Sequence, residues 1–149
     1  MKKKLFSLFV LLVLLSSAFA ANSEGIGRIK TLSGQVAIER SGTTYPAELG
    51  GTVFQGDIIL AGKDGAVGLL FDDDSRVAVG PNSSLVLDNF VFDQKTREGN
   101  FDVSLKKGTL SAISGKLTAK NPGAMKVRTP AAILAVRGTE FSAKVDDPK

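Results

Sequence analysis

Apolar residues alternate with polar or small ones in several segments of this chain. Successive residues of a β-strand point to opposite faces of a sheet, so a period of two predicts strands with one buried face. On this pattern, Val67, Leu69 and Phe71 share a buried face. The alternation recurs in segments 36–38, 67–71, 85–87, 101–105 and 141–145. The sequence therefore predicts an all-β protein.

Turn-forming residues separate the predicted strands. Glycine, proline, asparagine and aspartate gather there because they tolerate the backbone angles of tight turns. Short strands at this spacing are typical of barrels, sandwiches and stacked coils, and periodicity leaves the choice among them open. No segment shows a helical pattern, and the length fits one domain, which we place at residues 25–145. The turn clusters are 41–42, 50–51, 63–65, 80–82, 98–100 and 121–123.

Residues 1–20 have the three parts of a secretory signal peptide. Three lysines at positions 2–4 precede an apolar stretch at 5–15, and Ala18-Phe19-Ala20 fits a small-x-small cleavage site. The apolar stretch is too short to span a bilayer, which needs about 20 residues. We expect cleavage after Ala20 and a mature chain that starts at Ala21.

Composition argues against several classes of function. The chain has no histidine and no cysteine, so Ser-His-Asp and Cys-His catalysis, histidine-based zinc sites and disulfides are excluded. It has no tryptophan and a single tyrosine, Tyr45, which disfavours an aromatic platform for sugars or bases. Without residues 1–20, the chain has 19 − 3 = 16 basic residues and 15 acidic residues, so its net charge is 16 − 15 = +1. We therefore expect no catalytic residue, no cofactor, no metal and no nucleic-acid partner.

Three consecutive carboxylates, Asp72-Asp73-Asp74, offer oxygen ligands of the kind that calcium prefers. Their spacing is not that of an EF-hand, and adjacent strand residues point to opposite faces. We interpret them as an acidic turn between the strands at 67–71 and 76–79.

A second set of carboxylates, Asp57, Glu48 and Asp64, has the residue type of a glycosidase pair. Such a pair must flank the scissile bond at a set separation, and nothing in the sequence indicates a cleft. We expect these residues to have no catalytic role.

Arg137 is the single residue with the strongest candidate role. In one continuous strand it shares a face with Ile133 and Ala135, and a partly buried guanidinium needs a carboxylate or several carbonyl acceptors. It therefore serves either as an internal clamp or as an anion-recognition residue. We favour the clamp, with Asp57 as first partner, and Gly138 would permit a β-bulge after it.

The segment 116–128 is basic, and its lysines and arginines alternate with apolar residues. Such alternation is typical of a strand with a solvated face. We prefer that interpretation to an anion-binding site.

Several motifs occur in an order that resembles the FecR domain family. The last is Arg137-Gly138-Thr139-Glu140-Phe141, which follows an apolar run at 131–136. The sequence departs from the family pattern at Asp74, where the F-x-D-G-S hairpin has glycine. The other motifs are Gly56-Asp57-Ile58-Ile59 (GD-x-I), residues 67–75 (the hairpin), residues 80–85 (G-P-N-S-x-L) and residues 105–110 (L-x-x-G-x-L).

The resemblance implies an extracytoplasmic all-β module with a β-solenoid-like or compact jelly-roll (sandwich) fold, known mainly from signalling. It makes Asp57, Arg137, Gly138 and Thr139 structural signature residues. The family's best-known members add a cytoplasmic segment that contacts a sigma factor, followed by a transmembrane helix. We expect neither here, because a signal peptide precedes the domain and the chain ends soon after the signature.

We therefore expect an exported, non-catalytic module that binds another extracytoplasmic protein in signal sensing or relay. It would be periplasmic or secreted and would meet the membrane only through its transient signal peptide. The alternative is an envelope-associated structural protein that binds polysaccharide or peptidoglycan. The oligomeric state stays open at this level.

Overall fold

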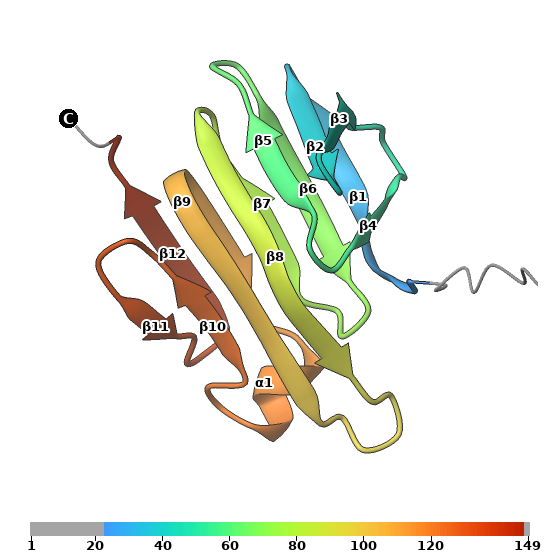
Figure 1. Ribbon diagram of the computed structural model, residues 1–149. Helices are drawn as coiled ribbons and strands as arrows, with labels where there is room; N and C mark the ends of the chain where they lie inside the picture. Colours follow the sequence, from blue (N-terminus) through green and yellow to red (C-terminus); the bar gives the residue numbers. More distant parts are fainter. Residues whose placement is uncertain (1–22, 148–149) are drawn as a thin grey trace, which may run out of the picture.

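Strands dominate the structure. A computed structural model describes residues 23–147, in which twelve strands and one short helix follow one another (Figure 1). The all-β prediction is confirmed. Residues 1–20 and the expected cleavage after Ala20 lie outside the described residues, and no helix within 23–147 is long and apolar enough to cross a membrane. The elements are β1 (Gly25–Ser33), β2 (Val36–Arg40), β3 (Thr43–Pro46), β4 (Thr52–Phe54), β5 (Ile58–Ala61), β6 (Ala66–Phe71), β7 (Arg76–Val79), β8 (Ser83–Phe92), β9 (Gly99–Ile113), α1 (Lys116–Lys120), β10 (Met125–Arg128), β11 (Ile133–Ala135) and β12 (Glu140–Val145).

The predicted alternation produces the buried face of the sheet. In β6, Val67, Leu69 and Phe71 are all buried, as expected from the period of two. The register of the β6–β7 hairpin places Val67 opposite Val79 and Leu69 opposite Val77. Directly opposed residues point to the same face, so the two strands add their apolar side chains to one core.

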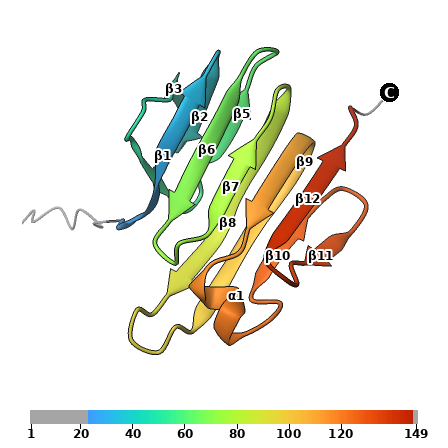
Figure 2. The ribbon, with the colours of Figure 1, turned by 180° about the vertical axis from the view of Figure 1, so that it is seen from behind.

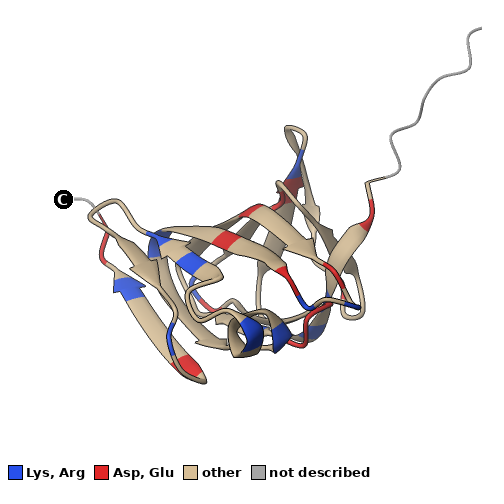
Figure 3. Ribbon diagram, turned by 90° about the horizontal axis from the view of Figure 1, so that it is seen from below, with Lys and Arg blue, Asp and Glu red and all other residues tan. Residues whose placement is uncertain are grey.

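All the strands of the described chain join in one sheet that curls around its apolar face. The main path runs β3-β2-β5-β8-β9-β7-β6-β1-β4, and β10, β11 and β12 attach beside β9. Neighbouring strands are antiparallel, except that β9 and β10 are parallel. The two opposite views in Figures 1 and 2 show the strands side by side, and Figure 3 shows them curling around the interior.

Strand β9 belongs to both halves of the curled sheet. One half contains β2, β3, β5, β8, β10 and β11, and the other contains β1, β4, β6, β7 and β12. The first part of β9 pairs with β8 and β10, and its second part pairs with β7 and β12. The change of partners occurs near Gly108, whose φ is +90°. A Cβ at this position would overlap Ser83, so the crossing point requires glycine for both conformation and space.

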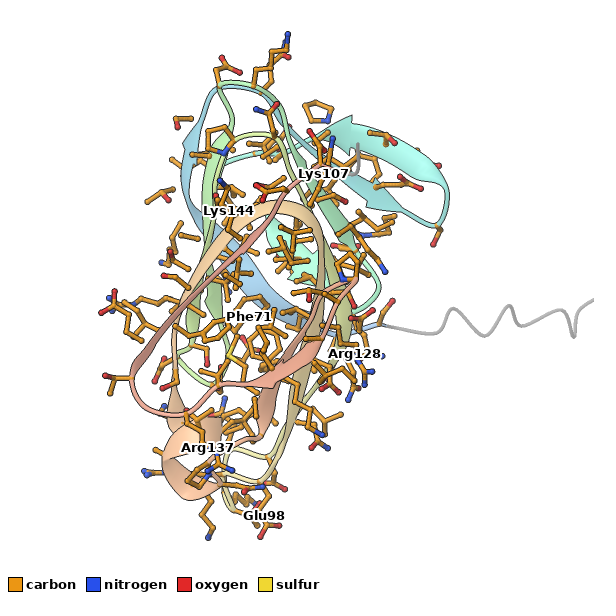
Figure 4. All side chains as sticks on the ribbon, turned by 90° about the vertical axis from the view of Figure 1, so that its left-hand side faces the viewer. Phe71, Glu98, Lys107, Arg128, Arg137 and Lys144 are labelled. Atoms are coloured by element: carbon orange, nitrogen blue, oxygen red, sulfur yellow. The ribbon has the colours of Figure 1, made fainter. Side chains whose placement is uncertain are left out.

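Three phenylalanines connect the two halves in the core. The ring centroid of Phe71 on β6 lies 4.5 Å from that of Phe101 on β9 and 5.7 Å from that of Phe90 on β8. The rings of Phe90 and Phe101 meet edge to face at 5.1 Å. Figure 4 shows Phe71 in the interior. Such tilted aromatic pairs add about 0.5–1.5 kcal/mol each beyond the burial of their area.

The segment 116–128 differs in part from the predicted strand. Lys116–Lys120 is the helix α1, and only Met125–Arg128 is a strand, in which Lys126 and Arg128 are exposed as expected. The helix buries Leu117 against the core. A helix of five residues is too short to show a period of 3.6 in the sequence, and its stability comes from tertiary packing.

Candidate functional site

Asp57 forms a buried ion pair, and its partner is Arg40. Asp57 is 0% exposed, and its Oδ1 accepts a 2.7 Å hydrogen bond from Arg40 Nε. Its Oδ2 accepts bonds from Arg40 Nη2 at 2.6 Å and from the backbone N–H of Phe54 at 2.9 Å. This two-pronged contact satisfies the buried carboxylate. The prediction that Arg137 pairs with Asp57 is therefore wrong.

Aromatic rings hold the guanidinium of Arg40 in place. Its central carbon lies 4.2 Å from the ring centroid of Phe54 and 5.5 Å from that of Tyr45. The hydrogen bonds to Asp57 raise the pKa of Arg40 above its usual value, against the lowering effect of burial. Both charges have an internal partner, so the cluster is a structural clamp between the end of β2 and the β4–β5 turn.

The acidic segment 72–74 forms the turn between β6 and β7, as predicted. Asp73 is buried, and its carboxylate accepts bonds from the backbone N–H of Ser75 at 3.1 Å and from the Ser75 hydroxyl at 2.6 Å. The Ser75 hydroxyl oxygen accepts the N–H of Gly115 at 3.0 Å, which ties the turn to the start of α1. Asp74 occupies the left-handed position, with φ +66°, where the family pattern has glycine.

The remaining acidic candidates do not form a catalytic pair. Asp57 is occupied by Arg40, and Glu48 is exposed in the β3–β4 connection. Asp64 is exposed in the β5–β6 turn, where its Oδ1 accepts the backbone N–H of Gln35 at 3.2 Å. Within residues 23–147, no group of three or more histidine, cysteine, aspartate or glutamate residues is placed to hold a metal ion.

Arg137 lies in the connection between β11 and β12, and it is exposed. Figure 4 shows it near the end of the molecule, away from Phe71 in the interior. Val136 continues the β10–β11 ladder on the opposite, buried face: it is 0% exposed, and its N–H donates to the Met125 carbonyl at 2.9 Å. Ile133, Ala135 and Arg137 are all exposed, so the expected packing of Arg137 on a buried face with Ile133 and Ala135 is wrong.

Gly138 and Thr139 carry the chain from one half of the sheet to the other. Gly138 has φ +89° and lies in a bend, not in a β-bulge. Its carbonyl accepts the Ser114 hydroxyl at 2.6 Å, and the Thr139 carbonyl accepts the Ser114 N–H at 2.9 Å. Beyond this bend, β12 pairs with β9, whereas β11 before it pairs with β10. These signature residues thus have a structural position, though a different one from that expected.

Apart from the buried Val136, the apolar run before Arg137 is exposed, and it includes the edge strand β11. All of residues 131–135 are exposed, and Ile133 and Leu134 are 60% and 37% exposed. Among the described strands, β11 pairs with β10 alone, so its other edge is open. Open apolar strand edges are surfaces to which other chains add. We take this edge as the candidate interaction site.

Sequence reasoning missed Arg40, although a signal for it was present. Arg40 has the same parity as Val36 and Ile38, so the alternation that predicts β2 also places Arg40 toward the buried face. Applied to Arg40, the requirement that a partly buried guanidinium has a carboxylate predicts an acidic partner for Arg40, without specifying which one.

Comparisons with known proteins identify the family. The chain matches the family described as FecR protein over residues 57–149, which is more than half of its length, and it belongs to this family. Comparison with the curated proteins gives no match. A solved structure titled "Cell surface anchoring domain" is similar, with 32% identity over 41% of this chain and 82% of that chain, at a TM-score of 0.40.

Proposed function

We propose that the protein is an exported, non-catalytic FecR-domain module that binds another protein of the cell envelope, in signal sensing or relay. Membership of the FecR family is the observation that carries this proposal. The family is a non-catalytic signalling family, and membership supports an envelope location. The expected signal peptide at residues 1–20 agrees with export to the periplasm or beyond.

The chemistry of the buried carboxylates supports a non-catalytic role. Asp57 is held by Arg40, and Asp73 is held by Ser75. A catalytic acid or base must exchange a proton with the substrate. A carboxylate that is engaged in internal hydrogen bonds is not available for this exchange. The chain also has no histidine or cysteine to serve as base or nucleophile.

Binding of a protein is favoured over binding of polysaccharide by the exposed groups. Sugar sites use aromatic faces, and Tyr45, the only tyrosine, is partly buried beside Arg40. The exposed edge at β11 is instead apolar, with open backbone groups, which suits a protein partner.

Site-specific photocrosslinking in the organism that encodes the protein tests the proposal. A photoreactive phenylalanine analogue would replace Leu49, Ile113 or Leu134, three exposed apolar residues in the β3–β4 connection, β9 and β11. We expect one envelope protein to be captured at one of these positions and to bind again when both proteins are purified. Mass spectrometry of the exported chain should give an N-terminus at Ala21.

Two results would count against the proposal. An intact chain starting at Met1 in the membrane fraction would remove the expected export. Sedimentation with cell-wall material, combined with no captured protein at any of the three positions, would favour the polysaccharide or peptidoglycan alternative.

A further inference from the structure

In the described sheet, β3, β4, β11 and β12 each have a single neighbour. The other three carry features that hinder the addition of a further strand, and β11 does not. Strand β3 contains Pro46, which has no N–H, and the Thr52 carbonyl on β4 accepts a bond from Arg40 Nη2 at 3.4 Å. Strand β12 exposes Glu140 and Lys144. Proline, covering groups and charges all hinder the addition of a further strand. Strand β11 has none of them and consists of exposed apolar residues.

The backbone groups of Ile133 and Ala135 point away from β10. The N–H of Val136 donates to the Met125 carbonyl at 2.9 Å, which marks a hydrogen-bonded pair of this antiparallel ladder. Bonded and non-bonded pairs alternate, so Leu134 makes the next bonded pair with β10. The N–H and C=O groups of Ile133 and Ala135 therefore lie on the open edge, where an added strand would bind them.

Two cations, Lys126 and Arg128, lie on the outer face beside this edge, and Asp102 on β9 neighbours Lys126 on the side away from β11. The register places Lys126 opposite Ala135 and Arg128 opposite Ile133, so both cations share a face with exposed apolar residues. Neither cation belongs to an ion pair among residues 23–147, and exposed Arg137 follows the strand. A strand added to β11 would lie about 10 Å from β10, two strand spacings away, within reach of these long side chains.

Together these observations point to one mode of binding. We infer that the open edge of β11 accepts an extended strand from the protein partner, and that this strand carries acidic side chains on the face next to Lys126 and Arg128. Main-chain hydrogen bonds supply attachment, and the charges supply selectivity. This inference rests on the proposed function and specifies how and with what chemistry the partner binds.

A second copy of this chain fits the edge less well. Pairing of β11 with its own copy would bring Lys126, Arg128 and Arg137 from both molecules to one joined edge. Like charges across an interface are unfavourable, whereas an acidic strand is attracted to the same surface.

Two synthetic peptides of equal length provide the test. In one, glutamate alternates with valine, and in the other, lysine alternates with valine. Each is titrated into the isotopically labelled, exported chain while the NMR signals and the hydrogen exchange of the Ile133 and Ala135 amides are followed. We expect the glutamate peptide to protect both amides and to bind at least about tenfold more tightly than the lysine peptide.

Substitutions on β11 and β10 separate the main-chain contribution from the charge contribution. Ala135→Pro removes one N–H of the open edge without touching the bonds to β10, and should weaken binding of the glutamate peptide about tenfold. Ala135→Ser keeps that N–H and is the matched control. Replacing both Lys126 and Arg128 with glutamate should reverse the preference between the peptides. Unchanged thermal unfolding shows that each variant is folded.

The outcomes distinguish the inference from the proposed function. Equal binding of both peptides, or unchanged binding by Ala135→Pro, overturns the inference. Signals of Ile133 and Ala135 that change on dilution without peptide would show that a second copy occupies the edge. An envelope protein captured at Leu49 or Ile113 but not at Leu134 would leave the proposed function standing and overturn the inference. Peptide binding at β11 with no envelope protein captured anywhere would overturn the proposed function alone.

Discussion

At the scale of single residues, Arg40 and Arg137 show how position decides the role of a guanidinium. Both follow apolar alternation in the sequence, the pattern from which a buried ion pair is expected for Arg137. Arg40 ends β2 on the buried side and reaches Asp57, whereas Arg137 follows a residue that turns into the core and is itself exposed. The stability of the protein should therefore depend on one arginine and not on the other.

Arg40→Ala should lower the free energy of unfolding by about 3 kcal/mol, because it leaves the carboxylate of Asp57 buried without its charged partner. This value is the lower end of the usual range, since the Arg40 side chain is 33% exposed. Arg40→Lys should cost less, because it keeps the charge and loses the two-pronged contact. Urea unfolding monitored by circular dichroism measures both effects.

Arg137→Ala is the matched control for Arg40→Ala and should change stability by less than about 0.5 kcal/mol, as expected for an exposed side chain. If the two alanine variants have the same unfolding midpoint, the assignment of the clamp to Arg40 is incorrect.

At the scale of elements, β9 determines how the sheet is built. It is the longest strand, at 15 residues, and it contacts neighbours in both halves. The requirement for glycine at position 108 follows from this role, because Ser83 on the neighbouring β8 fills the space that a Cβ would need.

Comparing Gly108→Ala with Gly42→Ala should isolate this steric effect. Both glycines have positive φ, +90° and +79°, so both substitutions carry the backbone penalty of about 1–2 kcal/mol. Only the alanine at position 108 would also collide with Ser83, which should add about 1–3 kcal/mol. Chemical denaturation of the two variants measures the difference, and equal losses would show that the crossing point tolerates a side chain.

At the scale of the whole molecule, the structural unit is larger than the segment that matches the family. The match begins at residue 57, but β1 pairs with β6 and β2 pairs with β5. Strands from before and after residue 57 therefore share one sheet and one core, and the Arg40–Asp57 clamp joins the two parts.

A chain of residues 57–149 should not unfold cooperatively, whereas a chain of residues 23–149 should. The shorter chain lacks the strands that cover β5 and β6, and it exposes their open edges and part of the core. Circular dichroism during urea titration compares the two, and a sharp transition in the shorter chain at the same midpoint would contradict the prediction.

Three features follow from local sequence alone: the strand character of the chain, the buried face of β6 and the acidic turn after it. These features depend on neighbouring residues, because side-chain alternation and turn preferences act over a few positions. Val67, Leu69 and Phe71 are buried as predicted, and Asp74 adopts the positive φ that an aspartate tolerates better than most residues.

Contacts between distant residues depend on how the strands pair, and local patterns do not predict them. Arg40 is the partner of Asp57 because the β2–β5 register brings the two ends together, and α1 forms because the core accepts Leu117. Val136, at the end of the apolar run before Arg137, is buried, yet residues 131–135 of the same run are exposed, because the sheet ends at β11 and no described strand covers it. Alternation specifies that a strand has an apolar face, but only the pairing of strands across the chain specifies what covers it.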